Sequence, residues 1–375
     1  MEIRIFAHSW LSDWNHGNAH FLRGMARALV HLGHGVELYE PLPGPWGGWS
    51  LAHLIAEEPL LAMSALGEFR RAYPDLAVNF YAVRTNGEGR GRWATQVAEI
   101  VRGADLVLVH EWNPPELLAE LAAARQRQRF LLLFHDTHHR AVSDPAALRR
   151  LPLGACDAVL VFGAALRAPY AAMGCRRTYV WHEAADETQF FPRAARREQD
   201  VLWIGNWGDG ERDGILREFL LQPAAQMPEA RFAVHGVRYP EAARAALRAA
   251  GVRLRGYLPN LRAPAAYAAS GLTLHLPRAP YQGPLAGIPT IRVFEVLACG
   301  APLVCAPWHD TEALFEAGAD YLVARDGREM RALLRDLLRD AAAARALGEH
   351  GRATIMARHT CRQRALELLE ICRQL

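Results

Sequence analysis

Two charged side chains, Arg292 and Glu295, stand three positions apart in an otherwise apolar segment that follows Pro289. Residues three apart share one face of a helix, and Thr290 is a suitable N-cap for a helix over Ile291–Cys299. A helix N-terminus attracts phosphate, a carboxylate one turn further on can accept hydrogen bonds from a ribose diol, and an adjacent Arg can hold an anion. An ion pair on a packed helix fits the spacing equally well, so both interpretations stay open.

A second candidate anion site follows the strand that we expect over Val201–Ile204. It consists of Gly205-Asn206-Trp207-Gly208-Asp209-Gly210, with Arg212 just beyond. Small residues let backbone N–H groups approach a phosphate. The segment has neither G-x-G-x-x-G nor a Walker pattern, which disfavours a dinucleotide or kinase site. The alternative is a tight turn that requires glycine.

Two more candidates, Arg278 and Tyr281, follow the strand expected over Leu272–Leu276. Parallel α/β sheets bind ligands at such strand ends. Arg278 could therefore neutralise a diphosphate, although a loop Arg exposed to solvent is the commoner situation.

The densest polar cluster of the first half is His135-Asp136-Thr137-His138-His139, after the strand expected over Phe130–Phe134. His and Asp are metal ligands, but the cluster lacks the spacing of H-E-x-x-H and has no cysteine nearby, so we expect no metal site. One alternative is a set of loop residues that satisfy local turns.

Strands alternate with helices along the whole chain, which predicts an α/β fold with parallel, doubly wound sheets. The expected strands of the first half are Glu2–Ala7, Val36–Tyr39, Asp105–Val109, Phe130–Phe134 and Cys156–Phe162. Those of the second half are Val201–Ile204, Arg231–His235, Val252–Arg255, Leu272–Leu276, Pro302–Cys305 and Tyr321–Val323. An apolar stretch over Leu51–Leu66 is expected to be a helical insertion, with a lipid- or acceptor-binding lip as the alternative.

Composition limits the class of protein. The chain has 375 residues, 51% of them hydrophobic and 22% charged, which is typical of globular domains and long enough for two of them. A net charge of +3 is too small to indicate nucleic-acid binding. The chain contains no Lys, so a phosphate contact must come from Arg, His or the backbone.

Cysteine usage and hydropathy predict a reduced, cytoplasmic protein. None of the six cysteines forms C-x-x-C, and most lie in apolar runs, which favours buried thiols over zinc sites or disulfides. The N-terminus does not have the pattern of a leader peptide, and no apolar run is long enough to span a bilayer. Peripheral membrane contact stays open.

The segment R-x-F-E-x-x-A-C-G-x-P-L around Glu295 resembles the donor-site helix of GT-B glycosyltransferases, most closely the CgeB-like (spore-maturation) enzymes and their family-four relatives. His182–Pro192 is similar to the family's hinge, and the end of the chain resembles its terminal helix. The resemblance implies two Rossmann-like domains around a cleft, with boundaries at 1–181, 182–199 as the hinge, 200–357, and 358–375 as a helix that packs back on the first domain.

The resemblance also implies a donor site in the second domain. Glu295 would contact the ribose, and would therefore lie in the cleft and not in the core, while the helix start faces the diphosphate. The segment Gly256–Asn260 would hold the nucleobase. The implied donor residues are Gly205, Asn206, Arg212, Tyr257, Leu258, Arg278, Tyr281, Thr290, Ile291, Arg292 and Glu295.

On the first domain, the resemblance places His135 and Asp136 across the cleft from the donor sugar, as contacts to the sugar or catalytic groups in proton transfer. Trp112 follows another strand end, where it could stack on a sugar or belong to the core. The residues implied for the acceptor side are Asn15, Gly17, Asn18, His20 and Trp112.

The sequence therefore predicts a glycosyltransferase of the hexosyltransferase type that uses a nucleoside diphosphate sugar, needs no metal or other cofactor, and retains the anomeric configuration. Many relatives carry a Glu eight positions before Glu295, where this chain has Gly287. The acceptor could be a glycan, a lipid-linked molecule or a small molecule. The alternatives are a nucleotide-sugar epimerase of similar fold and an inactive protein that binds a glycan or a partner.

Overall fold

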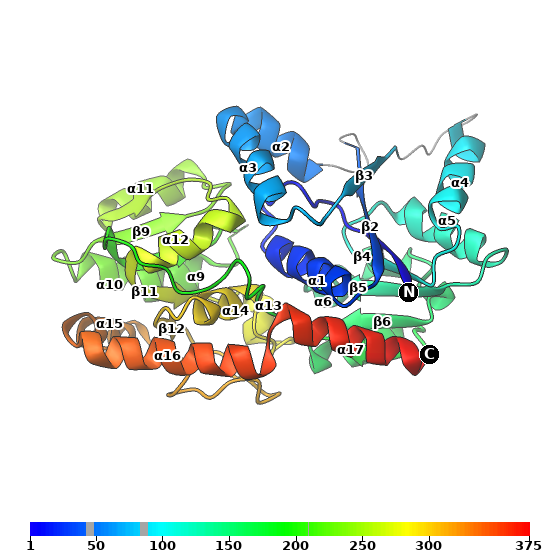
Figure 1. Ribbon diagram of the computed structural model, residues 1–375. Helices are drawn as coiled ribbons and strands as arrows, with labels where there is room; N and C mark the ends of the chain where they lie inside the picture. The colour runs from blue at the N-terminus through cyan, green and yellow to red at the C-terminus, as the bar shows by residue number, and fades with distance from the viewer. Residues whose placement is uncertain (43–48, 83–88, 209) are drawn as a thin grey trace. The chain divides into compact units, whose positions relative to one another are not determined.

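The computed structural model describes residues 1–42, 49–82, 89–208 and 210–375, so Asp209 of the glycine-rich segment lies outside the described residues (Figure 1). The chain divides into two compact units. The first unit comprises Met1–Glu183 and Cys361–Leu375, and the second comprises Ala184–Thr360. The main chain therefore passes between the units twice, after Glu183 and after Thr360.

The first unit contains a sheet of seven parallel strands in the order β3-β2-β1-β4-β5-β6-β7. Strand β4 is buried along its whole length, as expected for a strand with helices on both faces of its sheet. The strands are β1 (Glu2–Phe6), β2 (Gly35–Pro41), β3 (Val78–Tyr81), β4 (Leu106–His110), β5 (Leu131–Asp136), β6 (Ala158–Val161) and β7 (Thr178–Val180).

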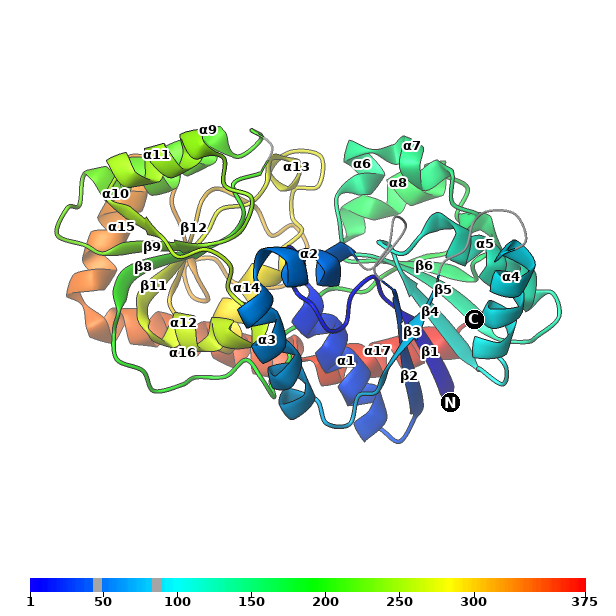
Figure 2. The same cartoon turned by 90° about the horizontal axis from the view of Figure 1, so that it is seen from above.

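Helices connect these strands, and the C-terminal helix α17 (Cys361–Arg373) packs against α1 in the same unit (Figure 2). The Trp181 indole fixes α17 further by donating to the carbonyl oxygen of Arg364 at 2.9 Å. The other helices are α1 (Ala19–His31), α2 (Trp49–Glu57), α3 (Pro59–Ala72), α4 (Gly89–Ile100), α5 (Pro115–Arg125), α6 (Arg140–Ser143), α7 (Pro145–Arg149) and α8 (Arg167–Ala172). Helices α2 and α3 form the predicted insertion.

The second unit contains a sheet of six parallel strands in the order β10-β9-β8-β11-β12-β13. All six correspond to strands expected from the sequence. They are β8 (Gln199–Ile204), β9 (Phe232–His235), β10 (Val252–Leu254), β11 (Ser270–His275), β12 (Leu303–Cys305) and β13 (Leu322–Val323).

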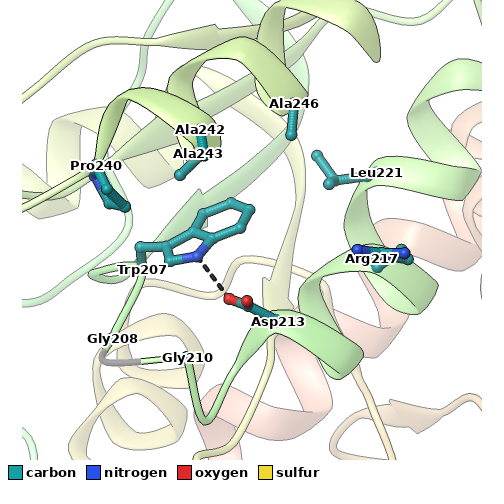
Figure 3. A pocket seen from close by; sticks show the side chains of 10 residues that line it. All are labelled: Trp207, Gly208, Gly210, Asp213, Arg217, Leu221, Pro240, Ala242, Ala243 and Ala246. Carbon is teal, nitrogen blue, oxygen red and sulfur yellow. Dashed lines mark hydrogen bonds between the residues drawn. The ribbon is translucent and has the colours of Figure 1, made fainter.

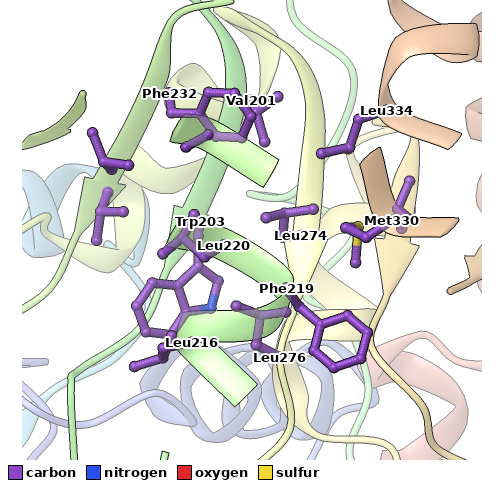
Figure 4. Packing of buried hydrophobic residues seen from close by; sticks show 14 of the residues in the cluster. Val201, Trp203, Leu216, Phe219, Leu220, Phe232, Leu274, Leu276, Met330 and Leu334 are labelled. Atoms are coloured by element: carbon purple, nitrogen blue, oxygen red, sulfur yellow. The ribbon is translucent and has the colours of Figure 1, made fainter. Parts of the chain in front are cut away.

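A buried apolar core joins this sheet to its helices (Figure 4). Leu274 of β11 and Trp203 of β8 contribute from the sheet, Leu220 from η3, and Met330 and Leu334 from α15. The helices are α9 (Asp213–Leu216), the π-helical turn η3 (Arg217–Leu221), α10 (Gln222–Ala225), α11 (Glu241–Ala249), α12 (Ala263–Ala268), α13 (Ala279–Gln282), α14 (Ile291–Ala298), α15 (Gly327–Arg339) and α16 (Ala341–Arg358).

Each sheet has one point where the strand order reverses, between β1 and β4 in the first unit and between β8 and β11 in the second. Ligands of doubly wound sheets bind beyond the carboxyl ends of the strands at such a point. Of the helices in the described residues, none is long and apolar enough to cross a lipid bilayer.

Candidate functional site

Two arginines flank the point of strand reversal in the second unit. Arg212 follows the loop after β8, and Arg278 follows the end of β11. Arg212 donates from Nη1 to the carbonyl oxygen of Asn206 at 2.9 Å, and its guanidinium lies 5.8 Å from the ring centroid of Trp203. Its Nε is buried and has no hydrogen-bond partner among the described residues. The guanidinium of Arg212 therefore lies at the carboxyl ends of these strands with one N–H donor, Nε, that makes no hydrogen bond within the described part of the chain.

The electrostatics of this region are dominated by positive charge. Burial, and after it the nearby cation of Arg278, lower the pKa of Arg212 to about 10. Arg278 forms an ion pair with Glu211, which compensates one of the two cations. A pKa near 10 still leaves Arg212 charged at neutral pH, so the site suits an anion.

The loop after β8 is shaped by close backbone contacts. Tyr239 donates its hydroxyl to the carbonyl oxygen of Gly205 at 2.6 Å, and Asn206 accepts from the backbone N–H of Val237 at 2.8 Å. A Cβ at Gly205 would collide with the ring of Trp203. Glycine is therefore required here by packing, and the loop is held next to Arg212.

The N-terminus of α14 adds a polar group to the same sheet edge. Nε2 of His275, at the end of β11, lies 3.1 Å from Oγ1 of Thr290, which precedes Ile291, the first residue of α14. Burial lowers the pKa of His275 to about 3, and the cations of Arg212 and Arg292 act in the same direction. His275 is therefore a neutral hydrogen-bonding group at physiological pH.

Glu295 lies inside the second unit, and the expectation that it would lie in a cleft is wrong. The side chain is fully buried. Its two carboxylate oxygens bind three neighbouring side chains of the same unit. Oε1 accepts from Nδ2 of Asn260 at 3.0 Å, Oε2 accepts from the hydroxyl of Tyr267 at 2.8 Å, and Arg292 forms an ion pair with it. A contact with ribose stays a prediction, and it would require these partners to move.

Two of the three partners of Glu295, Asn260 and Tyr267, were not expected from the sequence. Asn260 lies at the start of a short 3₁₀ turn and Tyr267 lies on α12, so neither is near Glu295 in the sequence. Arg292 also donates to the hydroxyl of Tyr267 at 2.8 Å. The acidic and basic groups of α14 thus join α14 to α12, which favours the ion-pair interpretation of their spacing.

The remaining donor-site candidates lie on loops and a short helix of the second unit. Tyr257 is largely buried in the segment after β10, where Leu258 is half-buried, and Tyr281 is buried on α13. The carbonyl oxygen of Gly256 accepts from the backbone N–H of Gly236 at 2.9 Å. The roles predicted for these residues stay predictions.

Gly287 has a structural reason to be glycine. Its φ is +94°, a conformation that side-chain-bearing residues rarely adopt, and a Cβ would collide with the side chain of Thr311. The glutamate that many relatives carry eight positions before Glu295 therefore cannot be accommodated by this backbone.

In the first unit, four buried histidines gather at the carboxyl ends of β1, β4 and β5. The ring centroids of His8 and His16 lie 4.2 Å apart, those of His8 and His110 5.6 Å, and those of His110 and His135 5.4 Å. Burial lowers the pKa of His8 and of His135 to about 3. The rings are therefore neutral at pH 7.

Several nitrogens of this histidine cluster are buried without a hydrogen-bond partner among the described residues. They are both ring nitrogens of His16 and of His135, and Nδ1 of His110. The other nitrogen of His110 lies 3.1 Å from Oγ1 of Thr137. Buried polar groups of this kind are commonly satisfied by internal water.

Next to the histidines, Glu111 and Asp136 form a buried carboxyl pair. Burial raises the pKa of both, and two adjacent buried carboxyls cannot both be charged at low cost, so one proton is held between them. Glu111 accepts from the backbone N–H of Thr137 at 2.9 Å and from Nε of Arg140 at 3.1 Å, and Asp136 accepts from the hydroxyl of Tyr170 at 2.6 Å.

Burial raises the pKa of both members of the carboxyl pair. For Glu111 the neighbouring charge of Asp136 raises the pKa further, while Arg140 lowers it. Two carboxyls with one shared proton and one arginine give a neutral group in the interior. His135 and Asp136 are both fully buried. Their contact with a donor sugar, or a role in proton transfer, stays a prediction.

The acceptor-side candidates lie in two places. Asn15, Gly17 and Asn18 share the loop before α1, where Asn15 adopts a left-handed conformation with φ 53°. His20 is fully buried on α1. Trp112 is half-buried, with the guanidinium of Arg140 4.0 Å from its ring centroid. The loop residues are thus reachable by a ligand, and His20 is not.

Sequence reasoning missed His8, His16, His110 and Glu40. Glu40 is the buried penultimate residue of β2. It accepts from the backbone N–H of Trp10 at 2.7 Å, and burial raises its pKa to about 7. The available signal was position, because His8, His110 and Glu40 stand at or just after strands. Single polar residues at strand ends are common, so the signal was weak.

No set of three or more His, Cys, Asp or Glu side chains in the described part of the chain is positioned to hold a metal ion. The four histidines of the first unit are therefore packed side by side and do not converge on a common point. Independence from metal stays a prediction.

Residues 212–370 match a protein family described as glycosyl transferase-like. This segment contains most of the second unit and most of α17. No curated protein sequence matches the chain.

Many solved structures are similar to this chain, and three examples cover its full length. HepE from Anabaena, in complex with UDP and glucose, has a TM-score of 0.72 at 15% identity and covers 100% of both chains. Sucrose-phosphate synthase from Thermosynechococcus elongatus has a TM-score of 0.66 at 16% identity, covering 100% of this chain and 98% of its own. An alpha-glucosyltransferase in complex with UDP and a 13-mer DNA has a TM-score of 0.70 at 12% identity, covering 100% and 99%.

These likenesses, together with the two parallel sheets, confirm the predicted fold: the chain has the GT-B fold with two Rossmann-like units. At such low identities the similarity to solved structures is one of fold. The finer resemblance to CgeB-like enzymes stays a prediction.

Proposed function

We propose that this protein is a glycosyltransferase that moves a sugar from a nucleoside diphosphate sugar to an acceptor. The observation that supports this most is the pair Arg212 and Arg278 at the strand reversal of the second unit, with a buried donor of Arg212 still unused. The match of residues 212–370 to the glycosyl transferase-like family covers both arginines.

Glycosyl transfer from a nucleoside diphosphate sugar requires groups that stabilise negative charge, and the two arginines are groups of this kind. In glycosyl transfer, the bond between the anomeric carbon and the diphosphate oxygen breaks, and negative charge develops on the departing diphosphate. An acceptor oxygen forms a new bond to the same carbon and loses its proton. Preorganised cations and helix N-termini stabilise the developing charge, and here Arg212, Arg278 and the start of α14 would take this role.

UDP is the first donor nucleotide to test, because HepE and the alpha-glucosyltransferase were both crystallised with it. The finer parts of the proposal are a retained anomeric configuration, independence from metal, and a cytoplasmic site of action. NMR of the product anomer would test the first, and donor turnover in EDTA would test the second.

The binding test is a thermal-shift series with UDP, GDP, ADP and dTDP, each with and without EDTA. A diphosphate at about 100 times its Kd stabilises the native state by about 2.7 kcal/mol, so the melting temperature should rise with at least one of them and should stay raised in EDTA. If none of the four changes the melting temperature, the proposed donor site is wrong. If EDTA abolishes the shift and magnesium restores it, independence from metal is wrong.

A further inference from the structure

The helical insertion of the first unit exposes large apolar side chains near the junction of its two helices. The exposed fraction is 50% for Ile55 in the last turn of α2, 85% for Leu60 and 78% for Met63 in the first turns of α3. Single apolar residues on a surface are normal, whereas neighbouring ones mark interaction sites. We call Ile55, Leu60 and Met63 the insertion patch.

Helix α3 packs on its own unit with one face only. Its buried residues, Ala62, Ala65 and Phe69, recur at helical spacing and form the inner face. Leu60 and Met63 are three positions apart and lie on the opposite, outer face. The two side chains therefore take no part in the packing of the unit, and they need a partner to leave water.

The outer face of α3 also carries two cations. Arg70 lies about two helical turns after Met63, and Arg71 lies about three turns after Leu60, so all four residues project from the same side of the helix. Both arginines are exposed, and neither forms an ion pair within the described part of the chain. The outer face is thus apolar at its start and positively charged at its end.

The acidic residues of the insertion lie away from this outer face. Oε1 of Glu57, on α2, is 3.2 Å from Nδ1 of His53. Glu58 precedes α3 and is half-buried, and Glu68 is half-buried at the side of the helix. The charge that the outer face of α3 presents to a partner is therefore positive.

The insertion is attached firmly to the rest of the first unit. Ser12 donates from Oγ to the carbonyl oxygen of Ser50 at 3.0 Å, and Ser50 donates from Oγ to the carbonyl oxygen of Trp14 at 3.0 Å. At the other end, Arg27 of α1 donates from Nη1 to the carbonyl oxygen of Ala72 at 3.2 Å. Figure 1 shows α2 and α3 side by side. The patch thus has a fixed support, and a partner bound to it would orient the whole unit.

The second unit offers a contrast in the way that it covers apolar groups. A cavity of about 480 Å³ lies between α11 and the helix formed by α9, η3 and α10 (Figure 3). Trp207 and Ala243 on its wall are buried in the apolar core, and the Trp207 indole donates to Asp213 at 2.7 Å. The apolar groups at this cavity therefore already cover one another, unlike those of the insertion patch.

We propose that the insertion patch docks on a lipid bilayer that contains anionic lipid. Leu60 and Met63, with Ile55 beside them, would enter the boundary between headgroups and acyl chains. Arg70 and Arg71 would remain at the level of the lipid phosphates, which long arginine side chains can reach while their stems lie on apolar surface. Helix α3 would lie in the interface with its first turn deeper than its last.

A bilayer is the partner that matches both parts of this face. Its surface combines an apolar interior with negative phosphate groups a short distance above it, and helices with apolar residues and arginines bind there. Aliphatic side chains without polar atoms need no shaped pocket to be covered by lipid. The proposal concerns attachment alone and does not depend on sugar transfer.

The test is co-sedimentation of the full chain with vesicles of phosphatidylcholine mixed with phosphatidylglycerol, without nucleotide. The double variant Leu60→Ser, Met63→Ser should bind at least about tenfold more weakly, because it removes the two most exposed apolar side chains of the patch. The matched control is Met356→Ser, at an exposed methionine on α16, and it should bind as the wild type does. All three side chains are exposed, so thermal unfolding should be nearly the same in both variants.

A second arm tests the arginines. The double variant Arg70→Gln, Arg71→Gln should bind the mixed vesicles about tenfold more weakly, and Arg127→Gln, at an exposed position elsewhere on the unit, should not. On vesicles of phosphatidylcholine alone the wild type should bind more weakly, and the arginine variant should bind these vesicles as the wild type does.

The proposal is overturned if the wild type does not sediment with the mixed vesicles, or if the Leu60→Ser, Met63→Ser variant binds as tightly as Met356→Ser. It is also overturned if, without lipid, the wild type self-associates in sedimentation velocity and the Leu60→Ser, Met63→Ser variant does not. The patch would then be an interface between copies of this chain. A lack of response to UDP with vesicle binding intact would contradict the proposed function alone.

Discussion

The two units differ in the charge of the polar groups at the carboxyl ends of their sheets. In the first unit the groups are neutral: histidines with pKa values lowered by burial, and the carboxyl pair Glu111 and Asp136 beside Arg140. In the second unit Arg212 and Arg278 keep a surplus of positive charge, with Glu211 as the nearby anion.

This difference indicates that the sheet of the second unit is the better binding site for an anionic ligand. Removing a charge from water is costly unless a partner compensates it, so an interior without ligand is expected to be neutral. The first unit meets this condition by itself. The second unit keeps a surplus cation, Arg212, as the diphosphate site that we propose there would require.

The largest effect should follow from breaking the neutrality of the first unit. Arg140→Met removes the cation next to Glu111 and Asp136 and should lower the free energy of unfolding by about 3 kcal/mol, the scale for an uncompensated buried charge. Urea denaturation of this variant measures it. Arg127→Met, at an exposed position on the same unit, is the control and should change stability by no more than about 0.5 kcal/mol. Equal stability of the two variants would show that the carboxyl pair needs no cation.

In the second unit, Glu295→Gln should also cost stability, by about 2 kcal/mol, because Arg292 loses its buried anionic partner. The structure further predicts that the loss of affinity on changing UDP to 2′-deoxy-UDP is the same in variant and wild type. Thermal unfolding and calorimetric titration measure the two effects. If the variant is stable and no longer distinguishes the two nucleotides, Glu295 contacts the ribose, as the family resemblance implies.

Arg212→Met should separate binding from stability. It removes a charged hydrogen-bond donor, worth roughly 1.5–3 kcal/mol, and should weaken UDP binding by about tenfold or more. Stability should change little, because the free energy of burying this cation offsets the loss of its hydrogen bond to the carbonyl oxygen of Asn206. Calorimetric titration with Arg253→Met as control tests this. Unchanged affinity for UDP would refute the role of Arg212.

The histidine cluster predicts a pH dependence for the first unit. The pKa of His135 is about 3 in the folded state and ordinarily 6.5, so below pH 6.5 the unfolded chain binds a proton that the folded chain refuses. Stability should therefore fall as pH drops from about 6.5 towards 3, by up to about 1.4 kcal/mol per pH unit for this residue. Glu40, with its pKa raised to about 7, acts in the opposite direction between its ordinary pKa of 4.5 and 7.

The comparison of His135→Met with wild type isolates the histidine, because Glu40 contributes to both proteins. The difference in unfolding free energy, variant minus wild type, should increase as pH falls from 6.5 to 4. Urea denaturation at several pH values measures it. A difference that does not vary with pH would mean that His135 titrates normally in the folded protein.

The smallest effect is expected for Glu111→Gln. If Glu111 holds the shared proton, the amide keeps a neutral donor towards Asp136, and stability should change by less than about 1 kcal/mol. Asp136→Asn is the complementary variant and should cost more, because it removes the acceptor of the Tyr170 hydroxyl. The reverse order in urea denaturation would place the proton on Asp136.

The sequence was sufficient for the sheet architecture. Every expected strand exists, because buried parallel strands are apolar runs that alternate with helices, and Leu131–Asp136 and Ser270–His275 are typical. Strands β3 and β7 were missed, since both are short and lie at the edges of the sheet, and β3 exposes part of its surface. Edge strands do not need the continuous apolar run that identifies the others.

The site was less predictable, because burial and partners depend on residues far away in the sequence. Spacing showed that Arg292 and Glu295 share a helix face, but only the fold shows that Tyr267 and Asn260 meet them there. In the same way, the polar segment His135–His139 indicated a functional site. The strand β5 runs on to Asp136, beyond its expected end at Phe134, and the contact of the segment with Glu111 depends on the pairing of β4 with β5.

The double passage of the chain between the units has a consequence for biosynthesis. Domains usually fold in the order in which the ribosome delivers them. Here Ala184–Thr360 is complete before α17 has been made, and α17 covers α1 of the first unit. The second unit can therefore finish folding first, while the nascent first unit holds α1 without its cover until the last helix emerges.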